Sequence, residues 1–258
     1  MTPFETWTSF YTIVRKDLIR IMRIWPQTFL PSVVTSVLYF LIFGSFLGDR
    51  LGAFGNIPYV NFVIPGLVML GVVTNAFSNV ATVFFASKFF ARNIDELLVS
   101  PTPPTVMVAG FVFSGVVRGV LVGLLVLLVS LAFADLRIYN PAVVVVFLLL
   151  TSLGLSLAGL INGIYAKSFD GITIIPTFVL APLVYLGGVF YSADILPAFW
   201  RVLTYLNPIY YIINGFRYGF LGITDVPIWI CSGVMLASIA ALAAVNWWLL
   251  KTGLGLRQ

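Results

Sequence analysis

Long apolar runs alternate with short polar stretches along almost the whole chain. Six runs are long enough to cross a bilayer as helices, for which about 20 mostly apolar residues suffice. They lie at 29–48, 60–85, 106–132, 141–164, 172–191 and 227–250. These runs are too continuously apolar for barrel strands, which alternate over about 10 residues. The pattern therefore predicts one all-α integral membrane domain, residues 1–258, with six transmembrane helices.

Residues 1–26 show a different, amphipathic pattern. Apolar side chains recur at steps of three and four residues from Trp7 to Trp25. The basic side chains lie on the opposite face: Lys16, Arg20 and Arg23. This arrangement is typical of a helix in the membrane interface, with its basic groups toward anionic headgroups. Alternatively, the apolar face packs on the protein's own cytoplasmic surface. In either case we expect Pro26 to end the helix.

The stretch 187–222, GGVFYSADILPAFWRVLTYLNPIYYIINGFRYGFLG, is apolar and aromatic but too interrupted to span a bilayer. The interruptions are Asp194, Pro197, Arg201, Pro208 and Arg217. Asn207 followed by Pro208 suits the N-cap and first position of a short helix. Backbone that does not span must be buried in protein or face a water-filled cavity at membrane depth. We therefore expect short helices, packed in protein or lining such a cavity, before the last span.

Composition and charge agree with a membrane protein. The chain is 60% hydrophobic and 9% charged, whereas soluble domains carry about 25% charged residues. The net charge of +5 reflects topology rather than a nucleic-acid partner. Nine lysines and arginines fall on the side of the two termini and four on the other side. The positive-inside rule then places both termini in the cytoplasm.

Small residues recur within two spans. Gly115, Gly119 and Gly123 follow at four-residue steps in the third span, and Gly159 and Gly163 do so in the fourth. Such spacing lets helix backbones approach closely. Two interpretations remain open: static packing, or a seam along which the helices slide or rotate.

Polar residues inside spans need partners. Arg118 in the third span would cost about 2.5–3.5 kcal/mol at mid-bilayer, so we expect it to face the bundle interior or a wet cavity. It either holds helices together by hydrogen bonds or serves a transport path. Asn75, Ser78, Asn79 and Thr82 share one face of the second span. They line a path or bond neighbouring helices.

Several chemistries lack their components in this sequence. No histidine occurs, and no acidic residue lies in a span core, so a proton relay of the usual kind has no members. Sodium coupling through unwound backbone stays open. The chain has no GxxxxGK phosphate loop, no HExxH motif and no paired catalytic carboxylates. We expect no catalytic residue, metal site or cofactor in this chain.

The interrupted stretch resembles the C-terminal signature of ABC-2 type transport permeases, and the resemblance covers essentially the whole chain. The chain is similar to an enterobacterial inner-membrane permease of this family whose substrate is unassigned. The stretches that carry it are MRIW, TNAF, RNIDELLVSP, PTFVLAPLVYLGGVFYS and GFRYGFLG. They are specific for the family and not for a substrate.

The resemblance implies a multi-pass permease of the bacterial inner membrane, working with a second permease copy in a homodimer. Two copies of a separate cytoplasmic ATP-binding cassette subunit would carry the ATP and Mg²⁺. The cargo exported would be amphipathic, lipidic, glycan or drug-like, and membrane lipid would surround the spans. The alternatives are an ion-coupled secondary transporter or channel acting alone, and a scaffold that only recruits a partner.

The resemblance also assigns regions to roles. Loop 86–105 matches the family's coupling helix, which docks into the ATPase, and segment 192–222 matches its external re-entrant helices. The coupling residues would be Arg92, Asn93, Asp95, Glu96, Leu97 and Leu98. The candidate path or gate residues are Asn75, Ser78, Asn79, Thr82, Arg118, Tyr191, Asn207, Pro208, Tyr210, Tyr211 and Arg217.

Overall fold

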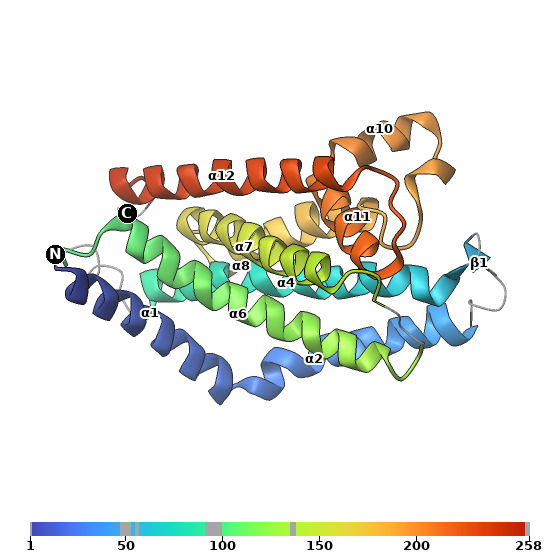
Figure 1. Ribbon diagram of the computed structural model, residues 1–258. Helices are drawn as coiled ribbons and strands as arrows, with labels where there is room; N and C mark the ends of the chain where they lie inside the picture. Colours follow the sequence, from blue (N-terminus) through green and yellow to red (C-terminus); the bar gives the residue numbers. More distant parts are fainter. Residues whose placement is uncertain (1, 47–52, 55–56, 91–99, 135–137, 256–258) are drawn as a thin grey trace.

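Six helices cross the length of a single bundle. The computed structural model describes residues 2–46, 53–54, 57–90, 100–134 and 138–255. Within these residues, six helices are long and apolar enough to cross a membrane: Trp25–Phe43, Tyr59–Phe89, Pro104–Ser130, Pro141–Tyr165, Phe169–Leu186 and Ile228–Thr252. Each overlaps one predicted span, so the all-α membrane fold is confirmed. Figure 1 shows the start of α1 and the end of α12 at one end of the bundle, with α10 and α11 toward the other.

Helix α1 (Pro3–Arg23) begins at a capping box. The Thr2 hydroxyl accepts a bond from the backbone N–H of Glu5, and the Glu5 carboxylate accepts one from the backbone N–H of Thr2. These bonds satisfy groups that the start of a helix leaves unpaired. The expectation that Pro26 ends this helix is wrong. The backbone bends at Ile24, and Pro26 lies in the first turn of α2 (Trp25–Phe40), where a proline needs no N–H partner.

One face of α1 packs on helix α6 (Pro104–Ser130). Ile13 and Val14 are buried, and Gly110 of α6 leaves the space that Ile13 fills. Trp7 and Tyr11 of the same apolar stripe are exposed. The helix thus uses part of its stripe against the protein and leaves aromatic side chains free to contact lipid. Its placement in the membrane interface remains a prediction.

Helix α4 (Tyr59–Phe89) forms the centre of the bundle. In the most hydrophobic 18-residue stretch of α4, 67% of the residues are buried, whereas the share in α12 (Ile228–Thr252) is 11%. It follows a minimal hairpin of two two-residue strands, β1 (Ala53–Phe54) and β2 (Ile57–Pro58). Helices α6 and α7 pack along α4, and α2 and α11 contact it as well, so its buried polar side chains meet protein rather than lipid.

The glycine pattern forms a packing seam between α4, α6 and α7 (Pro141–Tyr165). A methyl group on Gly119 would lie 2.8 Å from the Ser152 hydroxyl of α7 and 3.0 Å from the Ala76 side chain of α4. Gly159 of α7 lies directly against the backbone of Phe77. The glycines therefore bring the three helices to close approach.

The fifth span is assembled from three short pieces. They are α8 (Phe169–Ile175), the π-helical η2 (Pro176–Leu180) and α9 (Ala181–Leu186). Another π-helical turn, η1 (Leu41–Phe46), ends the first span. Proline supplies no backbone N–H and breaks the regular ladder, which accounts for the irregular turn at Pro176. The predicted end of this span at residue 191 is wrong: the helix stops at Leu186, because Gly188 adopts a left-handed φ of 81° and turns the chain.

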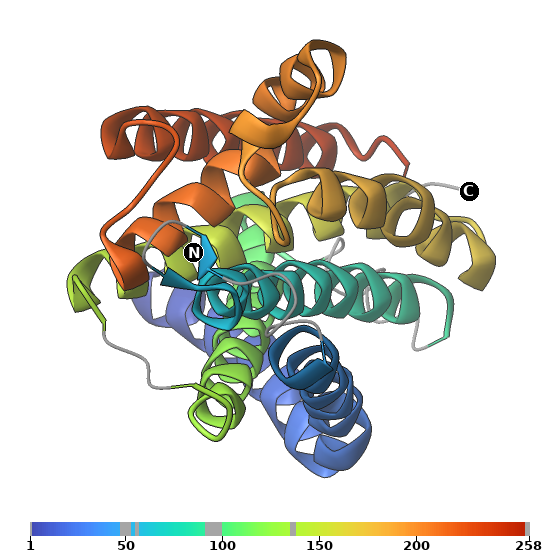
Figure 2. The same ribbon diagram turned by 90° about the vertical axis from the view of Figure 1, so that its right-hand side faces the viewer.

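The interrupted segment forms short helices that do not span. They are the 3₁₀ turn η3 (Ala193–Ile195), α10 (Ala198–Leu206) and α11 (Pro208–Leu221). As predicted, Asn207 caps α11: its side-chain oxygen accepts from the N–H of Ile209 at 3.0 Å, and Pro208 occupies the first turn. Figures 1 and 2 show α10 standing out from the bundle, whereas α11 lies within it. The apolar face of α10 is largely exposed in the single chain.

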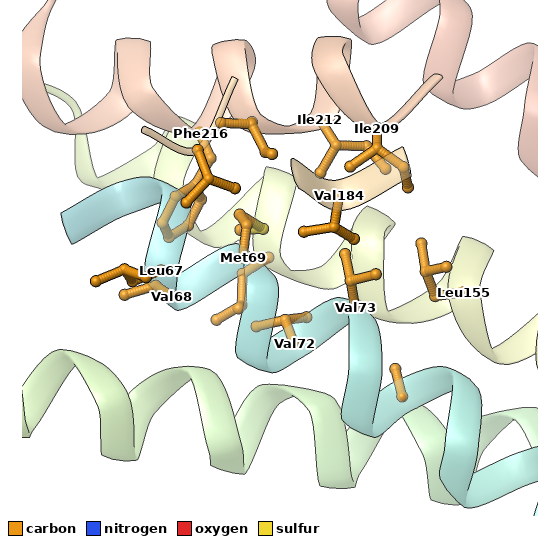
Figure 3. Packing of buried hydrophobic residues seen from close by; sticks show 14 of the residues in the cluster. Leu67, Val68, Met69, Val72, Val73, Leu155, Val184, Ile209, Ile212 and Phe216 are labelled. Carbon is orange, nitrogen blue, oxygen red and sulfur yellow. The ribbon is translucent and has the colours of Figure 1, made fainter. Parts of the chain in front are cut away.

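The core lies where α4, α7, α9 and α11 meet. Figure 3 shows Met69 and Val73 of α4 near Val184 of α9, with Ile209, Ile212 and Phe216 of α11 beside them. Burial of these branched side chains fixes α11 to the central helix. The interrupted segment is therefore anchored through its second helix.

Candidate functional site

A cluster of polar side chains joins four helices around Asn79, and we call it the Asn79 cluster. Its members are Asp17 and Arg20 of α1, Ser32 of α2, Asn75 and Asn79 of α4, and Ser114 and Arg118 of α6. The sequence predicted Asn75, Asn79 and Arg118, and the structure brings these three together. It places Arg118 toward the bundle interior, as expected, where its hydrogen-bond partners are the side-chain amide oxygens of Asn75 and Asn79.

Two arginines converge on a single oxygen. Nη2 of Arg20 donates to Oδ1 of Asn79 at 2.9 Å, and Nη1 of Arg118 donates to the same oxygen at 3.2 Å. Nη2 of Arg118 also donates to Oδ1 of Asn75 at 3.3 Å. Two bonds of this length to one acceptor hold the nitrogens within roughly 6 Å of each other. At an effective dielectric of about 20, unit charges at that separation repel by about 3 kcal/mol.

One carboxylate partly offsets this repulsion. Asp17 is 3% exposed, and its Oδ2 accepts from the Ser114 hydroxyl at 2.9 Å. Burial raises the pKa of the Asp17 carboxyl, while the Ser114 bond and the charge of Arg20 act in the opposite direction. When ionised, Asp17 balances one of the two arginines, so the cluster carries about one net positive charge.

A groove lined by hydroxyl groups leads away from this cluster between α2 and α4. It has a volume of about 170 Å³, and its hydroxyls come from Ser32, Thr35, Ser36, Tyr39 and Thr74, beside the apolar residues Pro31, Leu67, Leu70 and Gly71. The Ser36 and Thr74 hydroxyls donate to backbone carbonyls of their own helices. The groove begins at the cluster, because Ser32 accepts a bond from Nδ2 of Asn75 at 3.0 Å. Toward its other end, the Tyr39 ring centre lies 5.9 Å from that of Phe190, in the turn that follows α9. Polar side chains in a span avoid lipid, so this groove is suited to water or a polar ligand group.

Ser78 and Thr82 belong to the predicted polar stripe but not to the Asn79 cluster. Both are half-buried, and among the hydrogen bonds of the described residues none joins either of them to the cluster. Residues four positions apart lie above one another on a helix. Asn75 and Asn79 therefore point together toward α1 and α6, whereas Ser78 and Thr82 point to one side of these two.

A second cluster ties the interrupted segment to the last loop, and we call it the Asp225 cluster. Oδ2 of Asp225 accepts from the Tyr210 hydroxyl at 3.1 Å and from the N–H of Ala193 at 3.3 Å. The N–H of Asp225 donates to Oδ1 of Asn214 at 3.2 Å. Burial, and next the charge of Asp225, raise the pKa of Tyr210, so its hydroxyl stays protonated and keeps donating.

Arg217 is buried next to this cluster, with 1% of its side chain exposed. One Nη donates to the carbonyl of Gly188, and the guanidinium lies 3.9 Å from the centre of the Phe62 ring of α4. A cation over an aromatic face is stabilised more strongly when water is excluded. Arg217 thus fastens α11 to the glycine turn and to α4.

Two other predicted gate residues, Asn207 and Tyr211, hold the short helices by hydrogen bonds. Nδ2 of Asn207 donates to the Leu183 carbonyl of α9 at 2.6 Å, and the Tyr211 hydroxyl donates to the Tyr205 carbonyl of α10 at 2.7 Å. Tyr191 is half-buried beside the turn at Gly188. Pro208 lines an apolar cavity of about 250 Å³ among α7, α9, α11 and α12.

The predicted residues therefore fall into two places rather than one. Phe62, beside Arg217, and Asn79 are 17 residues apart on α4, which corresponds to about 25 Å along a helix. The hydroxyl-lined groove covers part of that distance. The predicted coupling residues lie outside the described part of the chain, and their roles stay predictions: Arg92, Asn93, Asp95, Glu96, Leu97 and Leu98.

Sequence reasoning missed several members of these clusters. It assigned Arg20 to the basic face of α1, toward headgroups, and the structure shows this to be wrong, since Arg20 points inward to Asn79. Asp17 carried a usable signal, because it follows Ile13 by four residues within the buried stripe. A charge in such a stripe indicates a buried partner. Asp225 lies in a short loop and carried no comparable signal.

The chain is similar to known membrane transport proteins. A model of the family described as ABC-2 type transporter matches residues 8–221. The chain is 51% identical over 252 residues to "Inner membrane transport permease YadH" of Escherichia coli K12, covering 98% of each chain. The same identity and coverage hold for the protein of that name from Shigella flexneri. "Nodulation protein J" of Neorhizobium galegae is 21% identical over 214 residues, with 83% of this chain and 82% of that protein covered.

Proposed function

The chain belongs to the ABC-2 type transporter family and is a multi-pass inner-membrane permease, and from this premise we propose that it exports an amphipathic substrate. The family implies a separate ATP-binding cassette partner. The sequence, without a phosphate-loop motif, is consistent with hydrolysis on that partner. We propose further that two such partners, holding ATP and Mg²⁺, serve a homodimer of this chain.

The observation that carries the proposal is the groove between the two clusters. A polar headgroup crossing a bilayer needs groups that replace water along its way. The hydroxyls from Ser32 to Tyr39 supply such groups on one face of α2. They lead toward the turn at Gly188, which Arg217 fastens to the short helices.

The short helices are suited to the role of a gate. Two elements hold them: the Asp225 cluster and the buried face of α11. Release of a few hydrogen bonds would free α10, whose apolar face is already exposed, without unfolding the bundle. In this proposal segment 192–222 lies on the outer side and closes the exit of the path.

The ATPase would dock at the opposite end. The end of α4 at Phe89 and the start of α6 at Pro104 lie at the end of the bundle where α1 starts and α12 ends. In our proposal Leu97 and Leu98 fill a groove on the ATPase, and Asp95 and Glu96 meet basic residues at its rim. Charge bias in the sequence places this end in the cytoplasm.

Co-purification tests the partner. A tagged full-length chain extracted from native membranes should bring an ATP-binding cassette protein with it. Leu98→Ala should weaken that complex, because truncation of a buried anchor shortens residence time. Leu128→Ala is the matched control, since Leu128 of α6 is 63% exposed and faces away from the bundle. Absence of an ATPase from the wild-type preparation would favour a transporter or channel acting alone.

Topology and direction need separate tests. Single cysteines at Asn93 and Ala198, in a Cys231→Ser background, should label oppositely with an impermeant thiol reagent in intact cells. Inside-out membrane vesicles should accumulate amphiphiles when ATP is added outside, whereas right-side-out vesicles should not. Equal labelling of the two positions would refute the six-span topology, and ATP-driven uptake into right-side-out vesicles would refute export.

A further inference from the structure

The arginine pair of the Asn79 cluster has weak partners for two positive charges. Both Arg20 and Arg118 use the neutral amide oxygen of Asn79, and the bonds of Arg118 are 3.2 and 3.3 Å long. Charge-assisted bonds to an anionic oxygen are shorter, at about 2.7–2.9 Å, and roughly twice as strong. An anionic oxygen would therefore replace these amide contacts with a net gain.

Donors remain unused in the same place. The Nε of Arg20 and the Nε of Arg118 are both buried without a hydrogen-bond partner. A guanidinium presents its N–H groups as a planar fork that matches two oxygens of one group. Two such forks directed at a common point suit a tetrahedral phosphate better than a single carboxylate.

Charge balance points the same way. Asp17 offsets one arginine, but its Oδ2 is engaged by Ser114, and the two guanidinium groups still face each other across Asn79. One further negative charge would neutralise the cluster. Each arginine is partly exposed, but its Nε is buried. A ligand would therefore engage the Nε donors only when the guanidinium groups turn toward it.

The surroundings suit an amphiphile rather than a free ion. Ser32 links the cluster to the hydroxyl-lined groove on the inner face of α2. On the outer face of α2, Leu30, Val34 and Leu38 are each about half exposed, at four-residue steps. A headgroup in the groove would thus have an apolar surface beside it for its acyl chains.

We propose that Arg20 and Arg118 together bind the phosphate of an anionic amphiphile at the Asn79 cluster. The inference rests on the proposed function in one respect: it names anionic phosphoryl amphiphiles as the substrate class of the permease. Asn75 and Asn79 position the two guanidinium groups, and Ser32 leads the remaining headgroup into the groove.

Retention of a probe lipid tests this site. The full-length chain, with its ATPase if one co-purifies, is reconstituted in phosphatidylcholine nanodiscs that contain a minor fraction of phosphatidylglycerol. Native mass spectrometry after extraction then gives the ratio of the two lipids that stay bound. The wild type should retain phosphatidylglycerol over phosphatidylcholine by about tenfold relative to the supplied mixture, and Arg20→Gln with Arg118→Gln should reduce that preference to about one.

Matched variants separate binding from folding. Arg23→Gln removes an exposed arginine of the same helix and should keep the wild-type preference. Arg118→Lys keeps the charge but loses the planar fork, so it should retain only part of the preference. Both proteins should elute as single peaks on size exclusion. A double variant that aggregates leaves the wild-type ratio and Arg118→Lys as the deciding measurements.

The outcomes decide the proposal. Equal retention of the two lipids by the wild type, or unchanged preference in a well-folded double variant, would overturn it. Displacement of phosphatidylglycerol by millimolar inorganic phosphate alone would overturn the amphiphile and leave a free-anion site. The measurement needs neither ATP nor transport, so its failure leaves the proposed export function standing. Conversely, wild-type lipid preference without any ATPase partner would overturn the export function alone.

Discussion

A methyl group at Gly159 should separate the two most extensively packed helices of the bundle. A Cβ at this position would lie against the Phe77 carbonyl oxygen, 3.0 Å from its carbonyl carbon and 3.1 Å from its Cα. These are backbone atoms of α4 and cannot rotate away, so α4 and α7 must move apart. Overpacking of this kind costs about 1–3 kcal/mol.

Helix propensity opposes this cost, and a second glycine measures it. Glycine is about 1 kcal/mol less favourable than alanine inside a helix, so we expect Gly159→Ala to destabilise by up to about 2 kcal/mol net. Gly233 of α12 has no atom within 4 Å of an added Cβ. Gly233→Ala should therefore stabilise by up to about 1 kcal/mol.

The apparent Tm in one detergent measures the difference between the two variants. For a chain of this size, 1 kcal/mol corresponds to about 2–4 °C, so Gly159→Ala should lower the apparent Tm by up to about 8 °C. Gly233→Ala should raise it by up to about 4 °C. Heating rates must match, because unfolding of such proteins is often irreversible. An apparent Tm for Gly159→Ala at or above that of Gly233→Ala would show that α4 and α7 are not in backbone contact.

The two clusters and the pH response give three further expectations. Arg118→Leu should reduce stability by about 1–3 kcal/mol, because it leaves the Asn75 oxygen without its arginine donor and the Asn79 oxygen with Arg20 alone. Arg118→Lys should lose less, and equal melting of both variants with wild type would show that these contacts of Arg118 do not stabilise the fold. Asp225→Ala should speed hydrogen exchange at the backbone N–H of Ala193, because that N–H loses its acceptor. Substitution of the exposed Asp194 by alanine is the control. Unchanged exchange at Ala193 would contradict the proposal that Asp225 holds the interrupted segment in place. Burial outweighs the attraction of Arg20 and raises the pKa of Asp17 above its ordinary value of 3.8, so wild-type stability should fall as the pH rises through that raised pKa. Asp17→Asn should therefore raise the apparent Tm at pH values above the raised pKa, and this gain should shrink toward about pH 4. A gain that grows on acidification would show that the pKa of Asp17 is not raised.

Local sequence patterns determined the spans and the cap of α11. An uninterrupted apolar run of about 20 residues is long enough to cross a bilayer whatever surrounds it. The Asn207–Pro208 cap depends on neighbouring residues and was correct for the same reason. The end of the fifth span was wrong because the left-handed turn at Gly188 depends on local backbone geometry that apolar character does not report.

Residue contacts between distant segments were decided by the tertiary structure alone. Arg20 and Asn79 are separated by 59 residues, and their bond requires α1 to pack on α6 beside α4. Periodicity placed Arg20 on a polar face, but it could not predict which face of the helix would pack against the bundle. Likewise, Tyr210 and Ala193 meet at Asp225 only after the interrupted segment folds back. The sequence by itself determined which segments enter the membrane, because transfer of an apolar helix is a local property; the tertiary structure decided which polar groups meet inside it, because burial of a polar group depends on the partners that other helices bring.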